Sequence, residues 1–384
     1  MNSRERVLTA LNHKEPDRVP FDLGGTVVTG IHYKAYAALR ALLGLPAREP
    51  KIIDMIQQLA LVEDDVMDRL GVDVKNISPR SSASFQITVG DMGDYTYFYD
   101  EFKIGWRSPK DGGWYYDMFD PPLAGQITVD DVDRFPLPAP LDPARFTGLR
   151  EMAIRVRDEE QRAVVMGNIS AGIFELLTWT RGYADAYADW GSGSPVARRL
   201  MDRVLQMQLA YWEKALGEVG DVIDVAQIAD DVAGQQGLLI SPRSYRKLLK
   251  PLHKELCDFI HARTGAKIFM HSCGAIRAII PDLIEIGVDI INPVQVSAVG
   301  MDSAELKAEF GKDITFWGGG VDTQGVFGTG TPDDVRADVR RRLRDFMPGG
   351  GFIFNTVHNI QGNVPAENIM AMWETMREYG VYGK

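Results

Sequence analysis

The stretch Lys267-Ile268-Phe269-Met270-His271-Ser272-Cys273-Gly274 changes character in its middle. It begins as a short apolar run, which is typical of a parallel strand covered on both faces. It ends with an imidazole and a thiol two residues apart, where the strand gives way to a loop. Both groups bind zinc in proteins. The sequence therefore predicts a buried strand that carries two candidate metal ligands, His271 and Cys273, at its carboxyl end.

Short apolar runs of this kind recur along the chain and alternate with helical patterns. The eight predicted strands are Arg18–Leu23, Val72–Ile77, Ala163–Asn168, Val222–Ile228, Lys267–His271, Val288–Asn292, Ile314–Gly318 and Gly351–Asn355. The predicted helices include Ser3–Asn12, Ile52–Leu70, Pro242–Arg263, Arg277–Ile286, Thr331–Phe346 and Ala366–Tyr379. Eight strand–helix units indicate an α/β protein and favour a closed (β/α)8 barrel, the TIM barrel, over an open doubly wound sheet.

One region, residues 78–140, departs from this alternation. It is rich in aromatic residues, glycine and aspartate, and the turn Pro109–Gly113 separates Trp106 from Trp114 as the loop of a hairpin would. We expect one domain spanning residues 1–384, with a β-rich insertion after the second strand that lies over one end of the barrel. Such an insertion serves either as a flap that covers an edge or as an aromatic wall over a substrate.

Charge and composition exclude several classes of partner. The formal charge of −11 over 384 residues argues against nucleic acid or an acidic membrane surface. No apolar run approaches the roughly 18–20 residues that a membrane-spanning helix needs, and the first residues form a charged helical pattern rather than a signal sequence. The two cysteines, Cys257 and Cys273, suit a reducing compartment. We expect a cytoplasmic protein that binds neither nucleic acid nor membrane, and we leave a homodimer open.

Active sites of (β/α)8 barrels lie at the carboxyl ends of the strands. Nearly every predicted strand here ends in a polar residue, and these ends converge on one mouth. The alternative is that each residue caps a helix or shapes a turn, which is the usual role of Asn and Asp after a strand. The polar residues at the strand ends are Asp22, Asn76, Asn168, Asp230, Asp231, His271, Cys273, Asn292, Gln295, Asp322, Asn355, His358 and Asn359.

A zinc site needs a third ligand besides His271 and Cys273. Of the six histidines, His358 is the other one that lies just past the end of a later strand. Three protein ligands leave one coordination position open for substrate, as in catalytic zinc sites. The set His271, Cys273 and His358 is therefore the predicted metal site.

A rival set of ligands lies on one predicted helix. His253, Cys257 and His261 are spaced by four residues, and positions eight apart drift by about 80° around a helix axis, so that all three do not converge on one ion. A further alternative needs no metal, because a hydrogen-bonded histidine beside a small buried thiol would give the same His-x-Cys pattern.

Motifs spread over almost the whole chain share their order with a known family. They are Arg4–Asn12, Pro16–Pro20, Gln227–Asp231, Ser241-Pro242, His271–Gly274, Gly349–Asn355, His358 and Pro365–Asn368. On these motifs the chain resembles the uroporphyrinogen decarboxylase superfamily, including its cobalamin-linked methyltransferase branch. The resemblance implies a (β/α)8 barrel with its pocket at the carboxyl-terminal mouth.

The loop after the first strand separates the branches of that superfamily. The decarboxylases bind a polycarboxylate tetrapyrrole through an arginine-rich loop at this place. Here residues 22–30 contain neither lysine nor arginine, and the next basic residue is Lys34. A cluster of substrate carboxylates without cationic partners is strongly disfavoured. Asp230, however, matches the aspartate of the central motif of the decarboxylases.

The methyltransferases of the superfamily carry His-x-Cys together with a distant cysteine, and these residues hold zinc. This chain keeps His271 and Cys273 but has no third cysteine at the end of its last strand, where His358 lies. In the decarboxylases a histidine also occurs there without any metal. The resemblance thus leaves the third ligand open.

The resemblance implies a corrinoid-dependent methyltransferase or demethylase. A methyl group would pass between a small methylated substrate and the cobalt of a separate corrinoid protein, with zinc as Lewis acid. An aryl methyl ether would suit the aromatic insertion. Asp230 and Asp231 would move a proton or orient a ligand. The alternatives are a uroporphyrinogen-type decarboxylase and a non-catalytic ligand-binding barrel. The residues expected to bind substrate are Asn168, Asn292, Gln295, Asp322 and Asn359.

Overall fold

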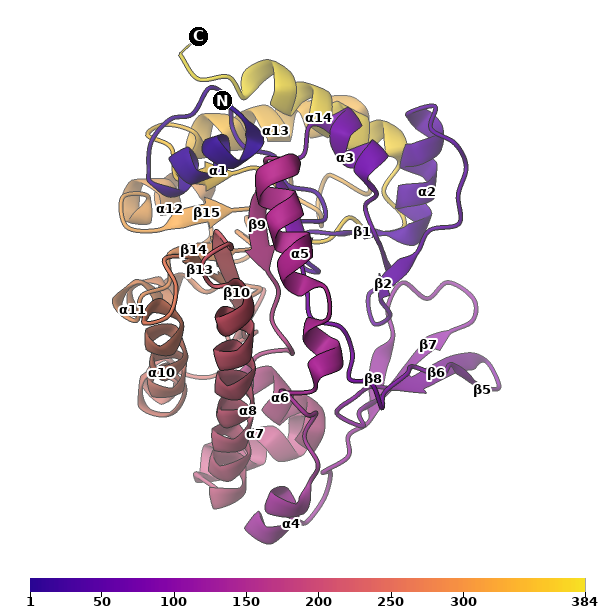
Figure 1. Cartoon of the computed structure of the whole chain (residues 1–384), viewed down its shortest axis with the longest axis vertical. Coiled ribbons are helices and arrows are strands. Elements are labelled where there is room, and N and C mark those ends of the chain that lie inside the picture. Colours follow the sequence, from indigo (N-terminus) through magenta and orange to yellow (C-terminus); the bar gives the residue numbers. More distant parts are fainter. Residues whose placement is uncertain (384) are drawn as a thin grey trace.

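The computed structural model describes residues 1–383 and is built around one curled sheet of seven parallel strands (Figure 1). Neighbouring strands follow the order β16-β15-β14-β13-β10-β9-β4. The strands are β4 (Val74–Ile77), β9 (Ala163–Met166), β10 (Val225–Ala229), β13 (Lys267–His271), β14 (Ile290–Asn292), β15 (Thr315–Trp317) and β16 (Phe352–Ile353). All seven lie within predicted strands or overlap them, because short apolar runs are the pattern of strands covered on both faces.

The segment Pro20–Asp22 closes the sheet into a barrel. On one side the Phe354 N–H donates to the Pro20 carbonyl at 2.8 Å and the Asp22 N–H donates to the Phe354 carbonyl at 2.9 Å. On the other side the Asp73 N–H, just before β4, donates to the Phe21 carbonyl at 2.8 Å. The predicted first strand is therefore short, but it stands at the eighth position. The predicted α/β barrel is confirmed.

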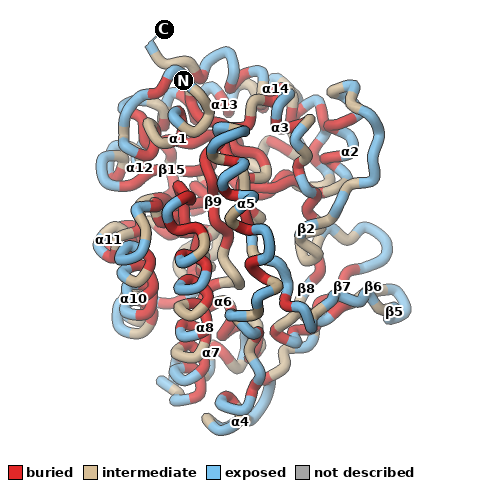
Figure 2. Tube along the Cα trace, in the orientation of Figure 1, coloured by how far each residue is buried: buried red, intermediate tan, exposed pale blue. Residues whose placement is uncertain are grey.

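The helices surround the barrel and turn their apolar faces inward (Figure 2). Several begin at the predicted signals; for example, the Thr331 hydroxyl accepts the Asp334 N–H in a capping box. No helix within residues 1–383 is long and apolar enough to cross a membrane. The helices are α1 (Ser3–Leu11), α2 (Tyr33–Leu42), α3 (Asp64–Leu70), α4 (Val129–Arg134), α5 (Leu149–Ile154), α6 (Ile173–Arg181), α7 (Tyr183–Ser192), α8 (Pro195–Val219), α9 (Pro242–Ser244), α10 (Lys250–His261), α11 (Ile280–Glu285), α12 (Ser303–Phe310), α13 (Pro332–Phe346) and α14 (Ala366–Tyr379).

The helix predicted over Ile52–Leu70 is wrong in its first half. That half forms β2 (Ile52–Asp54) and β3 (Leu59–Ala60), which join β1 (Ile31–His32) in a three-stranded antiparallel sheet; only α3 is helical. The Asp54 carboxylate accepts the Gln57 N–H at 2.7 Å, and this side-chain hydrogen bond turns the chain. Strand pairing and this turn override the helical spacing of the apolar residues.

The predicted insertion forms a four-stranded antiparallel sheet between β4 and β9, beside the barrel (Figure 1). The predicted hairpin is confirmed, since β7 and β8 pair on either side of the turn. The Trp106 ring from β7 packs edge-on against Trp179 of α6, with ring centroids 5.2 Å apart. The strands are β5 (Gly90–Met92), β6 (Tyr95–Tyr99), β7 (Gly105–Pro109) and β8 (Asp117–Asp120), and a separate hairpin consists of β11 (Ala233–Gly234) and β12 (Gly237–Leu238).

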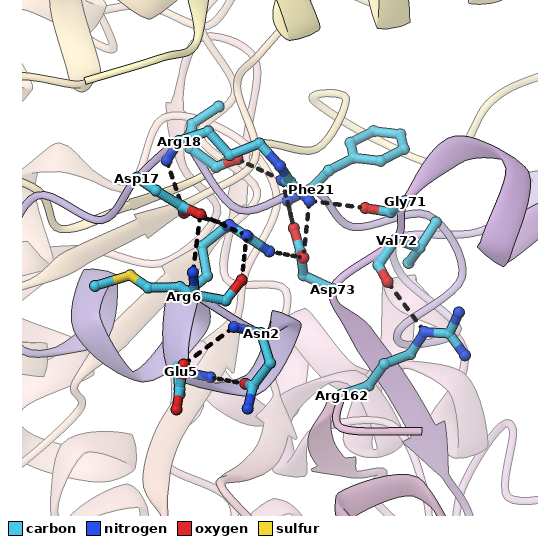
Figure 3. Close-up of polar contacts among 12 residues, drawn as sticks. Asn2, Glu5, Arg6, Asp17, Arg18, Phe21, Gly71, Val72, Asp73 and Arg162 are labelled. Atoms are coloured by element: carbon cyan, nitrogen blue, oxygen red, sulfur yellow. Dashed lines mark hydrogen bonds and ion pairs between the residues drawn. The ribbon is translucent and has the colours of Figure 1, made fainter. Parts of the chain in front are cut away.

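One buried carboxylate holds the closing segment in place (Figure 3). Asp73 is fully buried and accepts hydrogen bonds from Arg6 Nη1 at 2.7 Å, from Arg18 Nη1 at 2.7 Å and from the Phe21 N–H at 2.8 Å. It thus joins the first helix, the closing segment and β4 at a single point.

We expect Asp73→Asn to lower the free energy of unfolding by about 3–5 kcal/mol, because it removes the counter-charge of the largely buried Arg18 and one of the two carboxylate partners of Arg6, which also pairs with Asp17. Urea denaturation followed by circular dichroism measures this loss. Asp221→Asn is the matched control: it removes an exposed carboxylate that pairs with Arg150, and it should change the stability little. Equal effects of the two substitutions would show that the closure does not depend on Asp73.

Candidate functional site

A cavity of about 410 Å³ opens at the carboxyl ends of the barrel strands. Asn168, His271 and His358, predicted to lie at one mouth, all line it. Apolar groups form much of the remaining wall, and in the described part of the chain no lysine or arginine lines it. Its lining is Val27, Val28, Asp54, Ile56, Gln57, Ser78, Gly167, Asn168, Ile169, Ser170, Ala171, Glu175, Trp179, Gln227, Ala229, Asp231, His271 and His358.

A chain of buried hydrogen bonds orients His271 at the end of β13. The Asn292 amide donates to the Trp317 carbonyl at 2.8 Å, which turns the amide oxygen of Asn292 toward His271 Nδ1 at 2.7 Å. The Trp317 indole N–H in turn donates to Asp22 at 2.8 Å. Because Nδ1 of His271 faces an acceptor, Nδ1 carries the proton. The lone pair of Nε2 is therefore free to bind a metal.

That lone pair faces two further candidate ligands. His271 Nε2 lies 3.5 Å from Cys273 Sγ and 3.8 Å from an oxygen of Asp231. The ligand atoms of Asp231, His271 and Cys273 all lie within 4.8 Å of one another. Asp231 also accepts the Cys273 N–H at 2.7 Å, which fixes the loop that carries the thiol.

The spacing of these atoms fits a tetrahedral zinc ion. Bonds of about 2.0–2.3 Å at tetrahedral angles put neighbouring ligand atoms about 3.3–3.8 Å apart. The 3.5 Å from His271 Nε2 to Cys273 Sγ falls in that interval, whereas the 3.8 Å to the Asp231 oxygen lies at its upper end. Imidazole, thiolate and carboxylate are all accepted zinc ligands. The donor set therefore fits zinc with an open fourth position.

His358 lies beside this group rather than within it. Its ring centroid is 6.5 Å from that of His271, and its nitrogens do not join the cluster formed by Asp231, His271 and Cys273 in residues 1–383. Burial and the nearby His271 lower the pKa of His358 to about 4, so its ring is neutral at physiological pH. The geometry favours Asp231 over His358 as the third ligand.

Asp230 lies outside the cavity and holds the start of α6 in place. It is fully buried, and its carboxylate accepts the N–H groups of Phe174 and Glu175 at the start of α6, each at 2.9 Å. His253 Nε2 lies 2.9 Å from the same carboxylate. These contacts occupy both oxygens, and Asp230 does not line the cavity. Its geometry is that of a positioning residue.

Glu175 reaches the cavity because Asp230 holds the start of α6. The position was missed in the sequence, where it follows no strand. Burial, together with the charges of Asp231 and Asp230, raises the pKa of Glu175 well above its usual range. A carboxyl group that keeps its proton beside a ligand cluster is a candidate proton donor.

Of the five residues predicted to bind substrate, only Asn168 lines the cavity. Asn292 orients His271, and Gln295 accepts the Gly274 N–H at 2.6 Å. The Asn359 amide donates to the Val27 carbonyl at 3.0 Å and so fixes one apolar wall. The Asp322 carboxylate accepts the Gln324 N–H at 3.0 Å within its own turn.

Two glycines allow the loops of the site to approach each other closely. Gly274 has a φ of +92°, and a Cβ there would lie 2.6 Å from the Gly234 carbonyl oxygen. A Cβ at Gly172 would lie 2.3 Å from the Ala229 carbonyl oxygen. Larger residues would push the Cys273 loop away from β11 and α6 away from β10.

The aromatic turn of the insertion reaches the other side of the mouth. The Gln361 amide donates to the Tyr115 hydroxyl, and the charges of Cys273 and Asp54 both contribute to raising the pKa of Tyr115, whose main cause is burial. Trp114 packs edge-on against His32, with centroids 5.7 Å apart. The insertion therefore covers part of the mouth.

The rival helical set does not converge. Cys257 is fully buried, and burial raises its pKa to about 12. His253 contacts Asp230, whereas His261 Nε2 contacts the Gly287 carbonyl at 2.8 Å. No metal-binding group of three forms on this helix among residues 1–383.

Comparison with known proteins places the chain in a family. The family model described as uroporphyrinogen decarboxylase (URO-D) matches residues 116–379. A uroporphyrinogen decarboxylase from Mannheimia succiniciproducens is 23% identical over 279 residues, which cover 68% of this chain and 71% of that protein. Another, from Actinobacillus succinogenes, is 35% identical over 86 residues, or 21% of this chain and 23% of that protein.

The fold is also shared with a solved structure of a methyltransferase from Methanosarcina mazei. The TM-score is 0.65 at 19% sequence identity, and the superposition covers 99% of both chains. The family model spans more than half of this chain, so the family predicted from the separated motifs is confirmed. The chain belongs to the uroporphyrinogen decarboxylase family.

Proposed function

We propose that this protein is a methyltransferase that moves a methyl group between a small methylated substrate and the cobalt of a corrinoid carried by a partner protein. The observation that carries the proposal is the convergence of Asp231, His271 and Cys273 at a partly apolar cavity, which Asp231 and His271 line. The shared fold of the Methanosarcina methyltransferase is consistent with it.

Zinc is the metal that this donor set fits, and Asp231, His271 and Cys273 would hold it. When bound, zinc supplies a Lewis acid that polarises the heteroatom carrying the methyl group. The chain itself orients the ligands: Asn292 fixes the His271 ring, and Asp231 fixes the backbone of Cys273. Such supporting contacts normally set metal affinity as strongly as the spacing of the ligands does.

Two further features prepare the cavity for this chemistry. The raised pKa of Glu175 favours its protonated form near the ligand cluster, where it can protonate a heteroatom that has lost its methyl group. Trp179, Ile56 and Val28 line the cavity with apolar surface, from which a bound substrate would displace water. A dry site strengthens the electrostatic contacts of the bound substrate.

The acidic lining of the cavity disfavours binding of a polycarboxylate, and therefore its decarboxylation. The acidic residues Asp54, Glu175 and Asp231 line it, whereas no arginine or lysine does so in residues 1–383. Substrate carboxylates would meet repulsion there instead of cationic partners. The loop after the closing segment offers none either, as the sequence predicts.

We expect the purified protein to bind about one zinc ion per chain, measured by plasma mass spectrometry after dialysis. Cys273→Ala and Asp231→Asn should each lose most of it with little change in thermal midpoint, because the barrel core does not depend on metal. Zinc affinity should also fall at acid pH, as the ligands take up protons. His358→Ala tests the third ligand, since it should retain more zinc than Asp231→Asn.

Cys257→Ala is the control for loss of a thiol and should keep its zinc. Zinc content near zero in the unmodified protein after zinc is supplied would contradict the metal site. Greater zinc loss in His358→Ala than in Asp231→Asn would restore the ligand set predicted from sequence.

We expect Asn292→Ala to weaken zinc binding by about 10- to 100-fold, because the His271 ring loses its acceptor and its fixed orientation. Competition with a chromogenic chelator measures the change. Asn168→Ala, which removes an amide from the cavity but not from the ligands, should leave zinc affinity unchanged. A normal affinity in Asn292→Ala would show that the hydrogen-bond chain does not orient the ligand.

We expect the zinc-loaded protein to form methylcobalamin from reduced cobalamin and a methylated compound, which absorbance follows. Glu175→Gln should lower the rate by about 100-fold, the usual contribution of a positioned proton donor. Asp185→Asn, a substitution at the start of α7 outside the cavity, is the control. Conversion of uroporphyrinogen to coproporphyrinogen by the same preparation would instead establish a decarboxylase.

A further inference from the structure

The cavity has a second polar group, Asp54, on the wall opposite the ligand cluster. In the order of the barrel, β13 is separated from the closing segment Pro20–Asp22 by three strands on either side. The sheet that carries Asp54 joins the closing side, because Ile31 bridges to Ile360 beyond β16. Asp54 and His271 therefore face the same cavity from opposite sides of the mouth.

Asp54 has no cationic partner. The Gln57 N–H at 2.7 Å is a backbone donor, and no lysine, arginine or histidine side chain in residues 1–383 pairs with this carboxylate. Burial raises the pKa of Asp54. The rise reflects the free-energy cost of holding a negative charge away from water with no positive charge beside it. A charged group in this state favours any ligand that supplies the opposite charge.

No lysine or arginine side chain of residues 1–383 lines the rest of the cavity either. Trp179 contributes an indole ring to the wall, and aromatic faces attract cations. Val28 and Ile56 add apolar surface to the wall of the cavity, which suits a hydrocarbon body.

We propose that the substrate carries an ammonium group at the end opposite its methylated heteroatom, and that Asp54 binds this group. The inference rests on the proposed function, which places the methyl-bearing end at Asp231, His271 and Cys273. It assigns the substrate to one chemical class, a cationic amine with a methyl ether or thioether at its far end. It also gives Asp54 the role of selecting that class.

The experiment compares three probes of nearly equal shape by isothermal titration calorimetry at neutral pH. They are 3-methoxybenzylamine, which is protonated, 3-methoxybenzyl alcohol, which is neutral, and 3-methoxybenzoate, which is anionic. The amine should bind at least about tenfold more tightly than the alcohol, as a charge-assisted contact predicts, and the benzoate should bind most weakly. An alcohol or benzoate that binds as tightly as the amine would overturn the proposal.

Asp54→Asn identifies the residue responsible. The amide oxygen of asparagine can still accept the Gln57 N–H, so the turn is kept, while the charge is lost. The amine-to-alcohol preference should fall to near one, with the affinity for the alcohol unchanged. Asp91→Asn, which removes an exposed carboxylate from β5, should keep the preference. A preference that survives Asp54→Asn would refute the assignment.

Methyl transfer is scored separately with the same three probes. Transfer from the neutral ether without any preference for the amine would keep the proposed function and overturn the ammonium site. A strong, Asp54-dependent preference without methylcobalamin formation would keep the ammonium site and overturn the methyl-transfer reaction. If Asp54→Asn fails to fold, the ranking of the three probes on the unmodified protein still decides whether the cavity selects cations.

Discussion

Closure of the barrel by Pro20–Asp22 determines both the fold and the site. Asp73 holds this segment by accepting the Phe21 N–H and two guanidinium groups, so that β4 and β16 are bridged. The same segment carries Asp22, which accepts the Trp317 indole N–H. From Trp317 the hydrogen bonds continue through Asn292 to His271. The orientation of a candidate ligand is thus linked to the hydrogen bonds that close the barrel.

The sequence predicts the strands well and the side-chain neighbours poorly, and the reason is physical. An apolar run that ends in a polar residue identifies both a strand and the residue at its carboxyl end. His271, Cys273 and Asn168 could therefore be placed at the mouth from the sequence. The third candidate ligand depends instead on how the loop after β10 folds back: Asp231 is fixed by the Cys273 N–H, a contact between residues 42 positions apart. Spacing along the chain does not contain that information.

Glu175 and Asp54 were missed for a related reason. Glu175 lies in the first turn of α6 and enters the cavity only because Asp230 and His253 hold that turn. Asp54 lies in a segment whose apolar spacing indicates a helix, whereas its own side chain makes the turn that prevents one. In both cases a short-range rule fails at a site residue, and conflicts between local preference and final structure concentrate at such sites.

Asp54 and Glu175 are half-buried acids that line the cavity, and neither has a lysine or arginine partner within residues 1–383. Desolvation raises the pKa values of both groups. Each of these groups is costly in an empty cavity, and the surrounding core supplies the stability that tolerates them. A bound divalent cation would relieve the cost at one end, and an ammonium group would relieve it at the other. The proposed zinc ion and the proposed ammonium group would thus each supply the positive charge that lysine and arginine do not supply in the lining of the cavity within residues 1–383.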